Sequence, residues 1–288
     1  MAFIPYAASR KSLYHPGEAD DFFRLGPIRD HAALCAEMSR LAYVKDETRL
    51  RLYLGRIGYS QNLAFGYVTG GTQGFVASNQ DDHVTVVAFR GTEPDDSSDL
   101  FTNANVALTP WTDDAGRPLG KVHEGFAAAL QKTGILAHVK SCLELLAPST
   151  RVLLTGHSLG AALATLLSSR IPSAHLYTYG SCRVGDAAFA QAMQAASHTR
   201  FINCCDLVTR VPPATLGYVH AGSPQYIDRN GRLLGSPSEN EVNADRLKGA
   251  AWYFVRYALL PGTVFSRNLA DHAPINYVSA AMGLRLPE

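Results

Sequence analysis

The fold is decided by residues 151–169, which read RVLLTGHSLGAALATLLSS. The apolar run 151–155 is typical of a buried strand, and the Ala- and Leu-rich residues 159–169 favour a helix. The pentapeptide GHSLG, residues 156–160, joins the two without a loop. A residue at such an abrupt turn is strained, and flanking glycines remove the Cβ atoms that would block the close approach of strand and helix. The pattern therefore predicts that Ser158 stands at the turn with its hydroxyl projecting clear of the sheet.

A serine in this position is typical of a nucleophile. The Gly-x-Ser-x-Gly pattern also occurs by chance in glycine-rich turns, so the strand before it and the helix after it carry the argument. The first turn of that helix presents free N–H groups and the positive end of the helix dipole, which stabilise a developing oxyanion. We therefore expect Ser158 to attack a carbonyl carbon, provided that a base and a carboxylate lie nearby.

Strands and helices alternate around this turn. The β-branched run 84–89 is typical of a strand buried on both faces, and residues 30–42 have the apolar spacing of an opening helix. Residues 63–68 and 74–78 favour two strands joined by a turn at 69–71. This order predicts an α/β fold with a central, mostly parallel sheet flanked by helices. The other predicted elements are strands at 175–179, 200–204 and 217–220, one long crossover helix at 125–146, and a helix at 187–196.

Composition excludes several classes of protein. The chain has 288 residues, of which 47% are hydrophobic and 18% charged, so it can bury one large core and is too apolar to be disordered. No linker or repeat divides it, and we expect a single domain spanning residues 1–288. A formal net charge of +1 gives no overall field that would recruit nucleic acid or an anionic lipid. The five cysteines form no CxxC pair or zinc-like cluster, so neither a disulfide framework nor a metal site is expected.

The termini and the apolar segments bear on location. The first 23 residues contain no continuous apolar stretch of the kind that a secretory signal has, which predicts a cytosolic protein. A mature secreted form behind a new methionine would have the same appearance. Residues 250–260, AAWYFVRYALL, are interrupted by Arg256 and are shorter than the roughly 20 residues that a membrane span needs. No transmembrane segment is therefore expected.

The acid that would orient the base should follow the serine in the chain. Asp206 directly follows the predicted strand 200–204, which places it on a loop at the carboxyl edge of the sheet. Asp186 is the rival, but it precedes the predicted helix at Ala187 and suits an N-cap. We expect Asp206 to be the acid.

Two histidines follow Asp206 and are candidates for the base. His272 lies in a late loop, where its ring could reach the serine, whereas His220 falls in the predicted strand 217–220. His123 precedes the serine and suits a helix cap, and His157 flanks the nucleophile and is expected to pack beneath the turn. His272 is therefore the predicted base.

The negative oxygen of a tetrahedral intermediate needs two hydrogen-bond donors. One is expected to be the backbone N–H of Leu159, the residue after the nucleophile. The other should come from the loop that follows strand 84–89, where Thr92 offers both an N–H and a hydroxyl, and Gly91 lets the backbone approach closely. An ordinary strand-ending turn would have the same sequence, so Thr92 depends on the serine motif for its interpretation.

Taken in series, these motifs resemble the class 3 lipases, a family of fungal triacylglycerol lipases and plant acylglycerol lipases. The resemblance covers about residues 33–277 and implies an α/β-hydrolase fold, a triad of Ser158, Asp206 and His272, and an oxyanion hole of Thr92 and Leu159. The segments that carry it, in the family's order, are SRLAY at 39–43, FRGT at 89–92, VHEGF at 122–126, GHSLGAA at 156–162, YG at 179–180, RVG at 183–185 and DLVTRVP at 206–212.

Two segments depart from the fungal pattern. Residues 93–112 correspond to the family's lid; they are either a lid that opens on lipid or a surface loop packed on the core. Residues 228–271 form an insertion before His272 that is long compared with fungal relatives. Its apolar stretch 250–260 is expected to be a buried cap helix, with contact to a lipid surface or the acyl pocket as the alternatives.

The expected function is therefore hydrolysis of carboxylic esters through an acyl-enzyme on Ser158, with triacylglycerol as the first candidate substrate. A phospholipase A1, a small-ester esterase or an acyltransferase would use the same groups, and a catalytically silent lipid-binding protein would keep the fold. The triad carries the whole reaction, so no cofactor is expected. The expected partners are a lipid or other ester and, transiently, a lipid–water interface.

Overall fold

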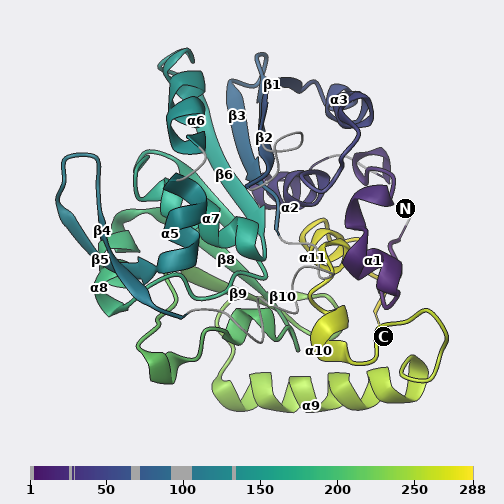
Figure 1. Ribbon diagram of the computed structural model, residues 1–288. Coiled ribbons are helices and arrows are strands. Elements are labelled where there is room, and N and C mark those ends of the chain that lie inside the picture. The colour runs from purple at the N-terminus through teal and green to yellow at the C-terminus, as the bar shows by residue number, and fades with distance from the viewer. Residues whose placement is uncertain are drawn as a thin grey trace.

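A central β-sheet organises the protein. The computed structural model describes residues 3–25, 28, 30–65, 72–91, 106–131 and 134–287. Within them, eight strands pair in the order β1-β2-β3-β6-β7-β8-β9-β10, and β4 and β5 form a separate hairpin (Figure 1). The strands are β1 (Ser60–Phe65), β2 (Gly74–Asn79), β3 (Val84–Phe89), β4 (Leu108–Thr112), β5 (Pro118–His123), β6 (Arg151–His157), β7 (His175–Tyr179), β8 (Ser197–Asn203), β9 (Ser223–Ile227) and β10 (Leu233–Leu234).

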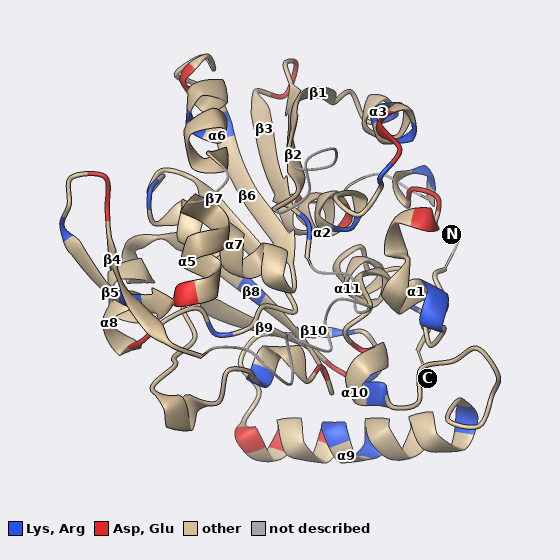
Figure 2. Ribbon diagram, viewed as in Figure 1, with Lys and Arg blue, Asp and Glu red and all other residues tan. Residues whose placement is uncertain are grey.

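The centre of the sheet is parallel, as the alternation of strands and helices predicted. Strands β3, β6, β7, β8 and β9 pair in parallel, while β1, β2 and β10 add antiparallel edges. Every residue of β3 is buried, and Figure 2 shows the central strands largely without charged residues. Strands that are covered on both faces need such continuous apolar sequences.

Each face of the sheet is covered by helices. Val86 and Ala88 belong to one buried cluster, and Val87 and Phe89 belong to the other, because successive side chains of a strand point to opposite faces. Helices α2 and α11 lie over the first face, and α5 and α7 lie over the second (Figure 1). The helices are α1 (Arg10–Tyr14), α2 (His31–Leu41), α3 (Glu47–Gly55), α5 (Glu124–Gln131), α6 (Ile135–Glu144), α7 (Leu159–Ser168), α8 (Ala187–Ala192), α9 (Glu239–Arg256), α10 (Arg267–Ala270) and α11 (Pro274–Ala281).

Local signals set most of the helix ends. Asp30 accepts a hydrogen bond from the N–H of Ala33 and begins α2 where the sequence predicted it. The single crossover helix predicted over residues 125–146 is wrong, because the structure has two helices, α5 and α6. Gly134, with φ of 66°, precedes α6 in the left-handed conformation and interrupts the helical path.

Two other predicted segments differ from the structure. Residues 217–220 are not a strand: Gly217 ends a 3₁₀ turn, and Val219 makes only an isolated bridge to Gly185. Strand β1 begins at Ser60, three residues before the predicted start at 63, and both the end of the predicted strand at 66–68 and the predicted turn at 69–71 lie outside the described residues.

The segment predicted as a lid or packed loop, 93–112, is described only from residue 106 onward. Its last five residues form β4, which pairs with β5. Trp111 is buried there, and its indole N–H donates to the Ser169 hydroxyl at 2.9 Å. This end of the segment is therefore packed on the core, while the rest, 93–105, lies outside the described residues.

The insertion 228–271 contains β10, α9 and α10. Helix α9 begins at a capping box, in which Ser238 and Glu241 each bond the other's backbone N–H. The prediction of a buried cap helix is wrong, because only Gly249 and Tyr253 of α9 are buried. None of the described helices is long and apolar enough to cross a membrane.

Candidate active site

Ser158 occupies the sharp turn that its sequence predicted. Its backbone has φ of 59° and ψ of −127°, which is a strained conformation for a side-chain-bearing residue, and its N–H donates to the Tyr179 carbonyl at 3.0 Å. A Cβ on Gly156 would lie 2.3 Å from the Gly160 backbone, and one on Gly160 would lie 2.3 Å from the Phe89 carbonyl oxygen. Glycine is thus required at both positions for β6, α7 and β3 to meet.

The loop after β3 passes directly against this turn. A Cβ on Gly91 would lie 3.0 Å from the Ser158 Cβ and 2.6 Å from the His157 carbonyl oxygen, so only glycine fits. Thr92, predicted as an oxyanion donor, lies outside the described residues. Leu159 begins α7 immediately after the serine, so its N–H is one of the free donors at that helix end.

Asp206 and His272 form a buried pair. The His272 Nδ1 and Asp206 Oδ2 atoms lie 2.9 Å apart, and the Asp206 carboxylate is fully shielded from solvent. Gly180, with φ of 59°, lies beside both groups, because a Cβ there would be 2.9 Å from Asp206 Oδ2 and 3.1 Å from His272 Nδ1. The sequence singled out both residues, and 66 positions separate them in the chain.

Two further donors hold the Asp206 carboxylate. The Tyr277 hydroxyl donates to Oδ2 at 2.5 Å, and the Val208 N–H donates to Oδ1 at 2.8 Å. Burial and the neighbouring Asp206 raise the pKa of Tyr277 well above its usual value, so the hydroxyl keeps its proton and remains a donor. Sequence reasoning missed Tyr277, which has no signal beyond its place on the helix that follows His272.

His157 connects the serine turn to the base. Its Nε2 lies 2.8 Å from the His272 carbonyl oxygen, and its Nδ1 lies 2.9 Å from the Tyr43 hydroxyl. A carbonyl only accepts, so Nε2 carries the proton and Nδ1 accepts from Tyr43. Burial, followed by the effect of His272, lowers the pKa of His157 well below its usual value, which keeps the ring neutral. The rings of His157 and His272 are 4.5 Å apart, so His272 lies against the residue that precedes Ser158.

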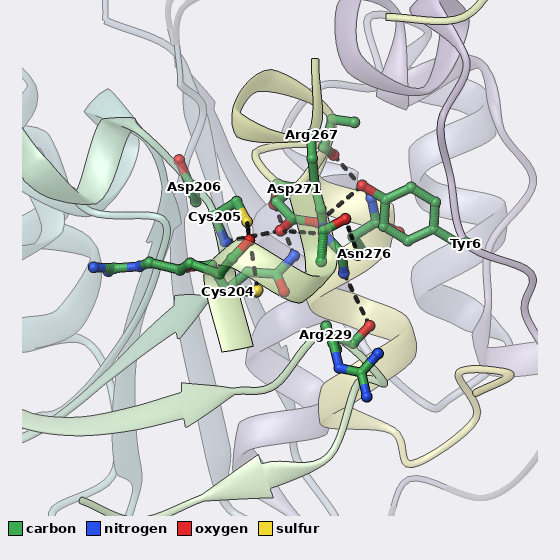
Figure 3. Close-up of polar contacts among 12 residues, drawn as sticks. Tyr6, Cys204, Cys205, Asp206, Arg229, Arg267, Asp271 and Asn276 are labelled. Atoms are coloured by element: carbon green, nitrogen blue, oxygen red, sulfur yellow. Dashed lines mark hydrogen bonds and ion pairs between the residues drawn. The ribbon is translucent and has the colours of Figure 1, made fainter. Parts of the chain in front are cut away.

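Asp271 links the segment that carries Asp206 to the segment that carries His272. Its carboxylate accepts from the Tyr6 hydroxyl at 2.9 Å, from the Cys205 N–H at 2.9 Å and from Arg267 Nε at 3.1 Å (Figure 3). Arg267 and Asp271 are both buried, and Cys205 and Asp271 immediately precede Asp206 and His272. We call Tyr6, Cys205, Arg267 and Asp271 the Asp271 network. Figure 3 shows Asp271 at its centre.

The rival candidates have structural partners. Asp186 accepts from the Phe189 N–H at 2.9 Å and begins α8, as a helix cap would. His123 Nδ1 accepts from the Gly125 N–H at 3.1 Å, the capping role that its position predicted. His220 Nε2 contacts the Thr209 carbonyl at 2.7 Å, and burial, reinforced by Arg200, lowers its pKa well below the usual value. None of these three is paired with Asp206 in the contacts of the described residues.

Within the described residues, one group of side chains has the composition of a metal site. Cys204, Cys205 and Asp271 bring their ligand atoms within 4.8 Å of one another. The atoms that could bind a metal already have partners. Asp271 accepts the three hydrogen bonds above, and the two sulfurs lie 3.5 Å apart, within hydrogen-bond distance of each other. The hydrogen bond with Cys205, together with burial, raises the pKa of Cys204, which disfavours the thiolate that metals bind. This group fits the hydrogen-bond network better than a metal.

Comparisons with known proteins find similar sequences among the lipases. Residues 86–216 match the family model described as lipase (class 3). The secreted mono- and diacylglycerol lipase A of Penicillium cyclopium is 34% identical over 195 residues, which are 62% of this chain and 56% of that protein. The secreted mono- and diacylglycerol lipase 1 of Fusarium solani is 34% identical over 136 residues, or 44% of this chain and 38% of that protein. The chain therefore spans about half the length, or less, of these relatives.

The fold is also similar to that of a solved lipase structure. The crystal structure of a lipase from Rhizopus microsporus var. chinensis superposes with a TM-score of 0.56 at 27% identity, over 68% of this chain and 72% of that one. Both have the α/β-hydrolase architecture, in which a mostly parallel sheet is flanked by helices. The matched residues 86–216 include the serine turn and Asp206. On this sequence and structural similarity, residues 86–216 resemble the class 3 lipases, and the described fold is similar to that of fungal lipases.

Proposed function

We propose that this protein hydrolyses carboxylic esters of glycerolipids, with Ser158 as the nucleophile, His272 as the base and Asp206 as the acid that orients it. Two observations carry the proposal: the strained Ser158 stands at the start of α7, and the ring of the preceding His157 lies 4.5 Å from that of His272 in the buried Asp206–His272 pair. Strain of this kind persists where the surrounding structure enforces it for a purpose. The match of residues 86–216 to the class 3 lipase model supports the same reaction.

The reaction follows from the hydrogen bond between His272 and Asp206. His272 Nδ1–H donates to Asp206, so Nε2 is free to accept the Ser158 proton as Oγ forms a bond to the ester carbonyl carbon. The carbonyl electron pair moves to oxygen, where the Leu159 N–H and Thr92 would stabilise the negative charge. When the intermediate collapses, the C–O bond to the alcohol breaks, and His272 returns the proton to the leaving oxygen. Water repeats these steps on the acyl-enzyme and releases the acid.

The Tyr277 hydroxyl and the Val208 N–H would prepare Asp206 for this role. Both donate to the carboxylate, so they fix its orientation toward His272. The negative charge then stabilises the imidazolium that forms when His272 takes the serine proton. The carboxylate does not itself need to accept that proton.

The acyl donor is proposed to be a glyceride. The resemblance to the class 3 lipases implies triacylglycerol, whereas the Penicillium and Fusarium relatives are named mono- and diacylglycerol lipases. We therefore propose partial glycerides and triacylglycerol as the first substrates to compare, with phosphatidylcholine and soluble esters as the alternatives. The names of both relatives describe them as secreted, and they give no support to the cytosolic location expected from the N-terminal residues.

The nucleophile is tested by covalent labelling. Incubation with a fluorophosphonate should add one organophosphoryl group to the peptide that contains Ser158, and mass spectrometry should locate it there. The Ser158→Ala variant should remain unlabelled and lose at least about 10⁴-fold in kcat. Wild-type protein that is folded yet neither labelled nor active on any ester would favour the lipid-binding alternative.

The substrate is tested by a panel of monoolein, diolein, triolein, phosphatidylcholine and p-nitrophenyl esters of increasing chain length. We expect the glycerides to have the highest kcat/KM. A preference for phosphatidylcholine, or for short p-nitrophenyl esters alone, would contradict the glyceride assignment while leaving the serine mechanism intact.

A further inference from the structure

Helix α9 presents an apolar face to solvent. Leu247, Phe254 and Val255 are 73%, 67% and 87% exposed. The spacing of 247, 251, 254 and 255 is the i, i+4, i+7, i+8 pattern with which a helix normally faces a core. Here that stripe points away from the protein. Two more apolar side chains after the helix are also exposed, Leu259 at 88% and Phe265 at 72%. We call Leu247, Phe254, Val255, Leu259 and Phe265 the α9 apolar face.

The opposite side of α9 anchors the helix. Tyr253 is buried, and its hydroxyl donates to the Val264 carbonyl at 2.5 Å. The Gly249 carbonyl accepts from Arg267 Nη1 at 3.1 Å, and a Cβ on Gly249 would meet the Arg267 guanidinium at 3.0 Å. The outward direction of the apolar face is therefore fixed by the packing on its other side.

The charges around this face are one-sided. Residues 246–266 contain the three cations Arg246, Lys248 and Arg256 and no aspartate or glutamate. The acidic residues of α9 all precede this stretch, and Figure 2 shows them toward the beginning of the helix. Arg246 Nε donates to the Cys204 carbonyl at 2.9 Å, so the exposed Lys248 and Arg256 are the cations of this segment that remain available to a partner.

We propose that the α9 apolar face docks onto a lipid surface that carries anionic headgroups. Exposed apolar side chains with Lys and Arg beside them are the composition of a helix that lies in a membrane interface. Trp252 and Tyr257 pack on each other beside Arg256, and both residue types are enriched at membrane–water interfaces. The inference rests on the proposed function insofar as the substrate is a lipid.

Docking here would orient the proposed active site. Arg267 bonds both the Gly249 carbonyl of α9 and the Asp271 carboxylate, and Asp271 immediately precedes His272. Figure 1 shows α9 along the outside of the molecule, with α10 between it and α11. The docked helix is therefore joined through the Asp271 network to the segment that carries the base. The lipid would be held at a defined orientation to the catalytic groups.

The test uses Ser158→Ala protein, so that vesicle binding is measured without hydrolysis. The partition coefficient is measured by sedimentation with phosphatidylcholine vesicles that contain about 30% of the anionic lipid phosphatidylglycerol. Adding Phe254→Ser, Val255→Ser and Leu259→Ser should lower it by more than about tenfold, because three exposed apolar side chains no longer enter the lipid. The matched control is Leu52→Ser, Leu145→Ser and Leu216→Ser, which alters three exposed leucines elsewhere and should leave binding unchanged.

The electrostatic part is tested separately. Lys248→Gln with Arg256→Gln should weaken binding to the anionic vesicles by about fivefold for each cation removed, and should leave binding to pure phosphatidylcholine unchanged. An equal loss on both kinds of vesicle would contradict the anionic-lipid assignment.

Two further measurements separate the proposal from its rivals. With Ser158 restored, the triple serine variant should hydrolyse p-nitrophenyl butyrate in solution at the wild-type rate, and a parallel loss would mean that the face supports the site rather than docking. The protein should be monomeric by light scattering. A dimer that the triple serine substitution dissociates would assign the face to a second copy of this chain, and unchanged vesicle binding would also overturn the proposal. Because binding is read on an inactive protein, its failure is distinct from a failure to hydrolyse esters.

Discussion

Helices α7 and α9 are both rich in apolar residues, yet they lie in opposite environments. Nine of the ten residues of α7 are buried, whereas only two of the 18 residues of α9 are. Helix α7 fills the space between the sheet and α5 and holds Ser158 at its first turn. Helix α9 is held only on its inner side and leaves its apolar stripe to the outside. The difference separates a helix stabilised by the core from one whose apolar face serves a partner.

The same substitution in both helices should give the largest contrast. Leu163→Asp would place an unpaired carboxylate in the buried cluster around α7, which costs several kcal/mol or more, and we expect no folded protein. Leu247→Asp on the α9 apolar face should change the free energy of unfolding by no more than about 0.5 kcal/mol. Circular dichroism and urea unfolding measure both, and a folded Leu163→Asp protein would contradict the assignment of α7 to the core.

The Asp271 network, which connects the two regions, should give the next largest effect. Asp271→Asn leaves the buried Arg267 without its counter-charge, and we expect a loss of about 3–5 kcal/mol in unfolding free energy. Tyr6→Phe, which removes one hydrogen bond from the same carboxylate, should cost about 1 kcal/mol.

Activity distinguishes positioning from mere stability in these variants. At a temperature where both remain folded, Asp271→Asn should lower kcat on a soluble ester more than it raises KM, because the backbone beside Asp206 and His272 loses its common anchor. An unchanged kcat would show that the network serves stability alone.

Much of the site could be predicted because its signals are local. The GHSLG turn has a strand before it and a helix after it, and Asp206 lies three residues after the end of β8, at the carboxyl edge of the sheet. The pairing of Asp206 with His272 is present in the structure, while the catalytic roles of Ser158, Asp206 and His272 remain predictions. Asp271 is different. Its partner Tyr6 is 265 residues away, and no local pattern indicates such a contact.

The errors in the fold have specific causes. Gly134 is visible in the sequence, but the apolar spacing on both sides of it favoured one helix over residues 125–146. The spacing of apolar residues in α9 correctly indicated a helix, and it could not indicate which side the protein covers. Periodicity reports that one face is apolar, whereas burial depends on the elements that pack against it. Thr92, which lies outside the described residues, stays a prediction.

Acid should destabilise the folded protein, because it contains buried histidines. Burial, assisted by Arg200, lowers the pKa of His198 to about 3, compared with about 6.5 in the unfolded chain. Below about pH 6.5 the unfolded state therefore binds a proton that the folded state rejects, so stability falls as the pH falls toward 3. This histidine should contribute about 1.4 kcal/mol per pH unit in that window.

The contribution is measured by urea unfolding between pH 5 and pH 8. His157 and His220 have pKa values lowered in the same direction and add to the slope. His198→Gln should reduce the slope below pH 6 by about one proton. A slope identical to that of the wild type would mean that His198 accepts its proton in the folded state.

A smaller contrast in stability should come from the serines at the beginnings of the two helices. Ser238 accepts from the Glu241 N–H at the start of α9, and an exposed helix depends on such a cap because little burial supports it. Ser238→Ala should therefore lower the free energy of unfolding by about 1 kcal/mol without changing the rate on a soluble ester. Ser158 stands at the equivalent position of α7 but makes no side-chain cap, so Ser158→Ala should stay within about 0.5 kcal/mol of the wild type. Urea unfolding of the two variants measures the stability that each serine contributes, and ester hydrolysis measures its contribution to activity. If Ser158→Ala lost as much stability as Ser238→Ala, the Ser158 hydroxyl would be supporting its helix, and the proposal that it is held free for chemistry would lose its structural basis.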